Sequence, residues 1–206
     1  MVGIVFATAD EAAPFVKQCA GRRPDEVEEG AFLRAGEVLI TVTGPGKIKA
    51  TLGTKRFLQQ HDVNILVHAG GAAALTDELA VGTLVGATFV LEGDRVALDA
   101  PSYPRMPLDP PADLSTEGTL VSQDHTDDGN SEEQSYWERI ADLRDETGYA
   151  VAYVAAQHGL PCHIVKGITH RAGAEAGLAN QRTKVGEAVA TFLQQYLEAL
   201  TDELDS

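Results

Sequence analysis

The chain is poor in basic residues and in cysteine, and both shortages narrow its chemistry. Its 206 residues include 16 Lys and Arg against 31 Asp and Glu, which gives a formal net charge of −15. This balance argues against nucleic-acid binding through a general basic surface, because phosphate contacts need clustered cations. The two cysteines, Cys19 and Cys162, belong to no CxxC pair. We therefore expect reduced thiols and no metal site.

Long hydrophobic runs and sorting signals are also missing. No apolar run of the sequence is long enough to span a bilayer. The N-terminal stretch MVGIVFATADEAAPF has neither a basic region nor a cleavage site of small residues. These features predict a cytoplasmic protein that makes no membrane contact.

Several catalytic fingerprints are absent. The chain has no G-x-S-x-G elbow of the serine hydrolases, and GPGKIKAT lacks the GK[ST] ending of a P-loop. HAGGAAAL follows an apolar run but does not match the dinucleotide-binding fingerprint, and no acidic ribose reader stands about 20 residues further on. We therefore expect neither serine-hydrolase chemistry nor a cofactor.

Apolar runs that alternate with amphipathic stretches are the main feature that is present. Residues 63–67 and 161–168 suit buried strands, and KVGEAVATFLQQYLEAL suits a long helix. This alternation predicts an α/β fold whose sheet is covered on both faces, and the lack of repeats and linkers predicts one domain over residues 1–206. A further helix is predicted in GPGKIKATLGTKRFLQQH, with the inward positions Ile48, Leu52 and Leu58.

Polar and small residues follow several of the predicted strands. In α/β sheets, ligands bind beyond the carboxyl ends of the strands. This rule selects the segments 7–11, 44–47, 68–73, 122–127 and 166–171. Glu146 and Thr147, at the predicted start of a helix, join them.

Three of these segments carry candidate chemistry, each with a plain structural alternative. Gly70 and Gly71 have no Cβ atoms, so backbone amides there can face a ligand or simply form a turn between a strand and a helix. Glu11 is placed to act as a general base, or as an acid that favours the first turn of a helix. His170 follows a strand, where an imidazole can transfer protons at neutral pH or serve as a structural group.

Taken together, the segments resemble one family. In order and spacing, GIVFATADEAAPF, TGPGKIKATLGT, VNILVHAGGAAALTDELAVGTLV, TLVSQD and DETGYAVAYVAAQHGLPCHIVKGITHRAG resemble the nucleoside phosphorylase/nucleosidase superfamily. They are most similar to its 5′-methylthioadenosine/S-adenosylhomocysteine nucleosidase branch. The resemblance implies a three-layer α/β/α sandwich with a central mixed, largely parallel sheet, often assembled as a homodimer. It also implies that the small-molecule partner is a nucleoside, whose N-glycosidic bond is cleaved by water or, in the phosphorylases, by phosphate.

The resemblance also assigns roles to residues. Glu11 matches the glutamate that holds and activates water in the nucleosidases. The small-residue turn beside the ribose corresponds to Gly70, Gly71 and Ala72. The segment 122–127 lies where the family contacts the base, which predicts base contacts from His125, Thr126 and Asp127.

Two positions depart from the family pattern. Thr147 stands where the family places a glutamate against the ribose hydroxyls, and Glu146 precedes it in place of a methionine. His170, after Thr169, stands where an aspartate serves N7 of the purine. These changes imply that Glu146 or Thr147 holds the ribose and that His170 assists the leaving base.

The sequence thus predicts a nucleosidase of altered specificity, with Glu11, His170 and Glu146 as its catalytic residues. A nucleoside-binding homologue without catalysis is an open alternative, because both altered positions replace carboxylates. A phosphate-dependent phosphorylase is a third reading, although no set of phosphate-binding arginines is visible.

Overall fold

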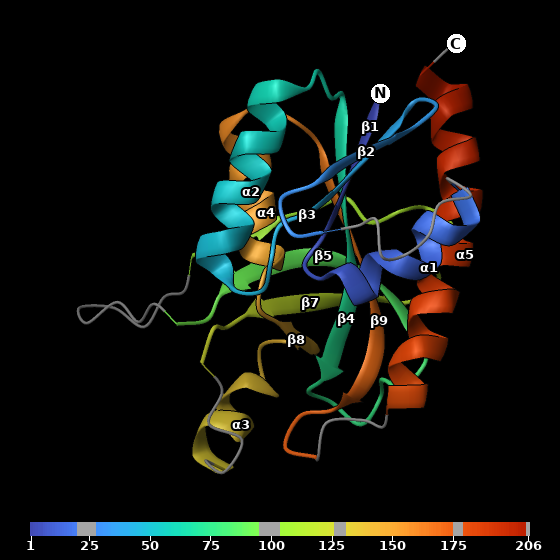
Figure 1. The fold of residues 1–206 in the computed structure, drawn as a ribbon. Helices are drawn as coiled ribbons and strands as arrows, with labels where there is room; N and C mark the ends of the chain where they lie inside the picture. Colours follow the sequence, from blue (N-terminus) through green and yellow to red (C-terminus); the bar gives the residue numbers. More distant parts are fainter. Residues whose placement is uncertain (20–27, 95–103, 126–130, 175–178, 205–206) are drawn as a thin grey trace.

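The computed structural model describes residues 1–19, 28–94, 104–125, 131–174 and 179–204, and these form a nine-stranded mixed sheet with helices packed around it (Figure 1). The strands are β1 Val2–Phe6, β2 Phe32–Ala35, β3 Val38–Val42, β4 Ile65–Ala74, β5 Leu84–Glu92, β6 Arg105–Pro107, β7 Glu117–Ser122, β8 Leu143–Asp145 and β9 Cys162–Arg171. The helices are α1 Ala9–Cys19, α2 Lys47–Gln60, α3 Ser131–Trp137, α4 Gly148–Gln157 and α5 Ala179–Leu204. No described helix is both long and apolar enough to cross a membrane.

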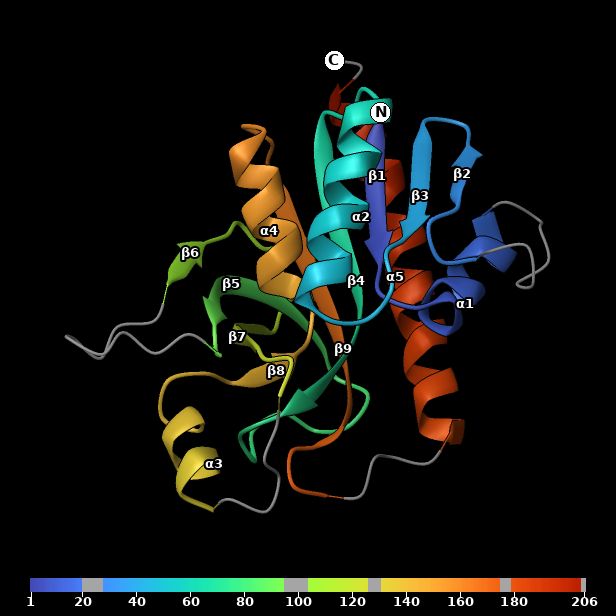
Figure 2. The same ribbon diagram turned by 60° about the vertical axis from the view of Figure 1, so that its left-hand side comes forward.

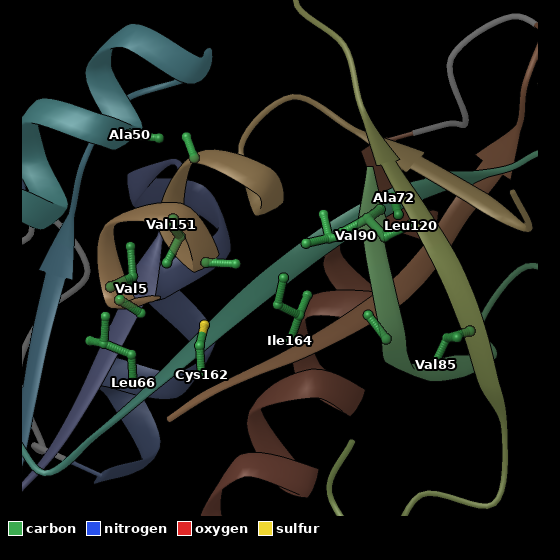
Figure 3. Packing of buried hydrophobic residues seen from close by; sticks show 14 of the residues in the cluster. Val5, Ala50, Leu66, Ala72, Val85, Val90, Leu120, Val151, Cys162 and Ile164 are labelled. Carbon is green, nitrogen blue, oxygen red and sulfur yellow. The ribbon is translucent and has the colours of Figure 1, made fainter. Parts of the chain in front are cut away.

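Helices cover the sheet on both faces. Helices α1 and α5 lie on one side, and α2 and α4 lie side by side on the other (Figures 1 and 2). Phe15 of α1 and Leu193 of α5 are fully buried in the first apolar layer. In the second layer, Leu66 and Ile164 of the sheet pack near Val151 of α4 (Figure 3). The predicted three-layer sandwich with a mixed, largely parallel sheet is confirmed.

Strand β9 closes part of the sheet on itself. It pairs with β4 in parallel and with β5 in antiparallel fashion, while β4, β8, β7 and β5 are linked in that order. The register places Phe6, the last residue of β1, beside Ala69 in the middle of β4. It also places Ser122 beside Asp145, and His170 beside Ala73. Residues far apart in sequence therefore meet where β1 ends against β4.

The segment HAGGAAAL is a strand, and its prediction as a turn is wrong. Strand β4 continues without a break from Ile65 to Ala74, since the neighbouring strand β9 pairs with it along this length. Small side chains are needed here for close packing. A Cβ atom on Gly71 would lie 2.9 Å from Cγ2 of Thr169.

The inward positions predicted for α2 are also partly wrong. Ile48 is 75% exposed and Leu52 is 64% exposed, whereas Leu58 packs against the core. The face that meets the sheet is instead formed by the buried residues Ala50, Thr54 and Phe57. A small residue and a threonine on the buried face, with aliphatic residues on the outer face, reverse the simple apolar pattern.

Both cysteines are free thiols. Cys162 is buried, and its burial raises the pKa of the thiol to about 12. Partial burial and the nearby charge of Glu198 also raise the pKa of Cys19. Both thiols therefore stay protonated at neutral pH and are poor nucleophiles.

Candidate active site

A cleft of about 1560 Å³ opens beside the point where β1 meets β4. Its walls come from α1, β4, β9, α5 and the chain between β8 and α4. The predicted residues that line it are Glu11, Gly70, Gly71, Ala72, Glu146, Thr147, Thr169 and His170. The fold thus brings most of the predicted site residues into one cavity.

The predicted base contacts are placed differently. His125 is exposed and does not line the cleft, while Thr126 and Asp127 lie outside the described residues. Gln123 of the same segment does line it, with 2% of its surface exposed. Its Nε2 donates to Oε1 of Glu133 in α3 (3.1 Å).

Glu11 is held rigidly at the cleft by neutral donors. Thr8 and Glu11 form a capping box at the start of α1: the Glu11 N–H donates to Thr8 Oγ1 (3.3 Å), and the Thr8 N–H donates to Glu11 Oε2 (3.2 Å). The second carboxylate oxygen, Oε1, accepts the N–H of Gly71 across the cleft floor (2.7 Å). Glu11 is therefore both an acid in the first turn of α1 and a carboxylate that lines the cleft.

Gly70 makes room for this carboxylate. A Cβ atom at this position would lie 2.5 Å from Glu11 Oε1, closer than real Cβ contacts allow. Any side chain here would displace Glu11 from the Gly71 amide. Gly70 is therefore needed in the middle of β4 because a larger residue would occupy the space of the Glu11 carboxylate.

Glu146 reaches the cleft from the segment that precedes α4. Partial burial of its carboxyl group raises its pKa, and the negative charges of Asp145, Asp124 and Glu11 raise it further. Carboxyl groups with perturbed pKa values in a cleft are candidates for functional roles. Glu146 and Glu11 give this part of the cleft a negative potential.

Thr147 borders the cleft, but its hydroxyl is engaged inside the protein. The residue is 2% exposed, and Oγ1 lies 3.0 Å from His68 Nε2 and 3.3 Å from Asp145 Oδ2. Glu146 and Thr147 lie in the bend between β8 and α4, where Thr147 is the N-cap residue of the helix. Glu146 faces the cleft, and Thr147 faces the buried groups behind it.

Those buried groups centre on the carboxylate of Asp145. Its Oδ2 lies 2.7 Å from the ammonium of Lys166, and its Oδ1 accepts the hydroxyl of Ser122 (2.6 Å). The N–H of Gly148 donates to both oxygens, at 3.1 and 2.9 Å. Burial alone would raise the pKa of Asp145, but the charge of Lys166, together with the contacts of His68 and the hydrogen bond of Lys166, outweighs burial and holds the pKa far below its usual range. The carboxylate is therefore ionised in the folded protein.

Sequence reasoning missed this network as a functional element. Lys166 is 1% exposed and His68 is fully buried; His68 is the one polar side chain of β4, and Lys166 stands in the apolar middle of β9. A lone ionisable residue inside an apolar strand is the signal that could have found them, because such a group must be paired when it is buried.

Thr169 fixes the protonation pattern of His170. The hydroxyl of Thr169 donates its only hydrogen to the carbonyl oxygen of Ala72 (3.1 Å). His170 Nδ1 lies 2.9 Å from the same hydroxyl oxygen, so Nδ1 must donate for both contacts to be made. A neutral His170 then carries its proton on Nδ1, and only the charged form has a proton on Nε2.

Lys47 ties three loops together at the edge of the sheet. Its ammonium pairs with Glu92 and with Asp94, and its N–H donates to Asp124 Oδ1 (2.8 Å). Partial burial lowers the pKa of Lys47, but the hydrogen bonds to Asp94 and Glu92 outweigh burial, so that its pKa is raised.

Among the described residues, no group of three or more His, Cys, Asp or Glu side chains is arranged to hold a metal ion.

Comparisons with known proteins agree with this architecture. Residues 1–202 match the family model described as the phosphorylase superfamily. A 5′-methylthioadenosine/S-adenosylhomocysteine nucleosidase of Staphylococcus haemolyticus is 27% identical over 120 residues, which cover 53% of this chain and 51% of the relative. The chain thus spans about half the length of the curated relatives it matches.

Solved structures show the same fold. A mutant of the Helicobacter pylori 5′-methylthioadenosine nucleosidase with 5′-methylthioadenosine in its active site is 21% identical, with a TM-score of 0.80. The futalosine hydrolase of the same organism is 20% identical, also with a TM-score of 0.80. Both likenesses cover 96% of this chain, together with 98% of the nucleosidase mutant and 97% of the futalosine hydrolase.

The buried carboxylate generates a prediction about stability. Asp145→Asn leaves Lys166 buried without its counter-ion, and we expect a loss on the order of 3–5 kcal/mol in the free energy of unfolding at neutral pH. Because the folded-state pKa of Asp145 is lowered, its contribution is present above the unfolded-state pKa of about 3.9 and is lost as the pH falls below it. The difference between wild type and variant should therefore shrink in acid.

Urea unfolding at neutral and acidic pH measures this difference. Asp113→Asn, at an exposed position, is the control and should change the free energy of unfolding by less than about 0.5 kcal/mol. An Asp145→Asn variant as stable as wild type at neutral pH would show that the ion pair contributes nothing.

Proposed function

Because this chain belongs to the phosphorylase superfamily, we propose that it is a nucleosidase that cleaves the N-glycosidic bond of a purine-type nucleoside with water. The observation that carries the proposal is the carboxylate of Glu11. It is fixed at the cleft by the Gly71 amide and by Thr8, and no described cation neutralises it by a salt bridge. A carboxylate held in this way can position water and accept its proton. A 5′-methylthioadenosine-like or S-adenosylhomocysteine-like nucleoside is the proposed substrate, by analogy with the matched relatives.

The reaction follows from the charges around the cleft. As the bond between C1′ and the base nitrogen breaks, its electron pair leaves with the base and the sugar becomes cation-like. Glu11 and Glu146 supply negative charge on that side of the cleft, which stabilises the cation. Water attacks C1′ and gives its proton to Glu11. Charged His170 donates its Nε2 proton to the departing base.

A nucleoside-binding protein without catalysis is the second candidate, and one observation favours it. Thr147 carries no charge, and its hydroxyl is engaged by His68 and Asp145 rather than facing the sugar. The sugar therefore lacks a carboxylate at that position, and Glu146 is the nearest replacement. Saturable binding without release of free base would support this reading.

Base release from nucleosides tests the proposal directly. We expect the protein to release free adenine from 5′-methylthioadenosine or S-adenosylhomocysteine without added phosphate, measured by chromatography. Glu11→Gln keeps an acceptor for the Gly71 amide but loses the base, and should lower kcat/KM by about 100-fold or more. Glu117→Gln, at an exposed position far along the chain, should leave kcat/KM unchanged.

Two results would contradict the proposal. One is that no member of a broad nucleoside panel releases its free base. Calorimetric binding of a nucleoside without such release would then identify the protein as a binding homologue. The other is release that depends on phosphate, which would make the protein a phosphorylase.

The tautomer of His170 generates a pH prediction. Only charged His170 carries a proton on Nε2, so kcat/KM should fall with rising pH as His170 loses its proton. Thr169→Val releases Nδ1, so that a neutral His170 can place its proton on Nε2. We expect this variant to keep a larger share of its activity at high pH, measured as the pH profile of kcat/KM. Thr191→Val, at an exposed part of the cleft wall, is the control; identical profiles for Thr169→Val and wild type would refute the assignment.

We also propose that the protein assembles as a homodimer through α2 and α4. The outer face of α2 exposes Ile48 and Leu52, one helical turn apart, and the neighbouring helix α4 exposes Tyr153 (Figure 2). Tyr153 stacks on Tyr149 with ring centroids 6.1 Å apart. In a chain of formal net charge −15, exposed apolar side chains on two adjacent helices favour contact with a second copy.

Leu52→Glu tests this interface. A carboxylate buried between two copies would be unpaired and strongly unfavourable, so we expect the variant to be monomeric at concentrations where wild type is dimeric. Gln194→Glu adds the same charge at an exposed position of α5, on the other side of the sheet, and should remain dimeric. Light scattering coupled to gel filtration measures both; a monomeric wild type, or a dimeric Leu52→Glu, would rule out this interface.

A further inference from the structure

The contacts of His68 leave only one arrangement of its proton. Its Nδ1 lies 2.9 Å from the carbonyl oxygen of Val5, which can only accept a hydrogen bond, so Nδ1 carries hydrogen. Its Nε2 lies 2.8 Å from the ammonium of Lys166, which can only donate, so Nε2 carries a lone pair. Both neighbours therefore require a neutral imidazole with its proton on Nδ1.

Lys166 is the cation that this imidazole helps to hold. Its ammonium lies 2.7 Å from Asp145 Oδ2 and 2.8 Å from His68 Nε2, and its side chain is only 2% exposed. An ammonium has three donors, so two are directed at these acceptors and one remains. Lys166 borders the cleft, beside Gly70 in the register of β4 and β9.

We propose that His68 is a positioning residue which, together with Asp145, aims the third donor of the Lys166 ammonium at the sugar of a bound nucleoside. This inference rests on the proposed function. It supplies the sugar contact that Thr147 does not make, because the Thr147 hydroxyl is used by the same buried groups. The Lys166 and Asp145 charges cancel, so the donor approaches the sugar without opposing the positive charge that develops there.

The arrangement depends on a neutral His68. The groups that face its ring are the Val5 carbonyl from β1, Thr147 from the N-cap of α4, Asp145 from β8 and Lys166 from β9. A second proton on the ring would place two buried cations beside the single carboxylate of Asp145, and Lys166 would lose its acceptor. Burial and the charge of Lys166 both lower the pKa of His68, which favours the neutral ring.

Nitrogen-15 NMR of the full chain tests the arrangement without reference to catalysis. We expect the His68 ring to stay neutral, with its proton on Nδ1, as the pH falls through the range in which ordinary histidines become charged. Exposed His158 is the internal comparison. Lys166→Met removes the neighbouring charge and should let His68 gain its second proton at a higher pH. A proton on Nε2, or titration together with His158, would overturn the inference.

Two variants at His68 test its role in ligand binding. His68→Gln keeps an acceptor for Lys166, whereas His68→Leu removes it at similar bulk. With 5′-methylthioadenosine as the probe, we expect His68→Leu to weaken binding by roughly tenfold or more, as for a lost charged hydrogen bond, and His68→Gln to restore most of it. In an active enzyme the effect should appear mainly in KM.

Calorimetric binding of 5′-methylthioadenosine separates this inference from the proposed function. Binding that weakens in His68→Leu and recovers in His68→Gln supports the positioning role even when wild type releases no base. Equal binding by wild type and His68→Leu, or equal weakening in both variants, would overturn it, because His68 would then only fill space. Should His68→Leu fail to fold, the NMR titration of wild type decides.

Discussion

The ion pair between Lys166 and Asp145 is the interaction on which the rest of the site depends. Two charges buried this deeply are costly unless each finds partners. Here Ser122 and the Gly148 amide complete the shell of the carboxylate, and neutral His68 completes that of the ammonium. The network joins the end of β7, the end of β8, the middle of β4 and β9. It therefore holds the start of α4 against the strands that line the cleft.

The carboxylate of Glu11 is held by backbone and hydroxyl groups rather than by an ion pair. Thr8 caps α1 and holds Glu11, while Gly70 leaves the space and Gly71 the amide that the carboxylate needs. The cleft thus combines the negative charges of Glu11 and Glu146 with the charge-neutral pair of Lys166 and Asp145. This combination suits a reaction in which a sugar becomes positive while water is activated beside it. His170, oriented by Thr169, adds a proton donor for the leaving group.

Much of the frame could be predicted from the sequence, because alternating apolar and amphipathic segments dictate a covered sheet. Glu11 could be placed at the cleft because it follows the first buried strand. The exposure of Ile48 and Leu52 could not be predicted from the sequence. The sheet-facing positions of α2 are taken by Ala50, Thr54 and Phe57, and this set is less apolar than the set that the hydrophobic pattern selects. Apolar residues at an intermolecular face and in a core have the same sequence pattern.

The roles of His68 and Lys166 were also beyond sequence reasoning, because they come from contacts between residues far apart along the chain. The structure of Glu11→Gln crystallised with 5′-methylthioadenosine is the most direct test of the proposed nucleosidase site. We predict that the sugar lies between residue 11 and Lys166, with a water held by residue 11 on the face opposite the base and with the base beside His170. A nucleoside bound outside this cleft, or bound with its base toward residue 11, would contradict it.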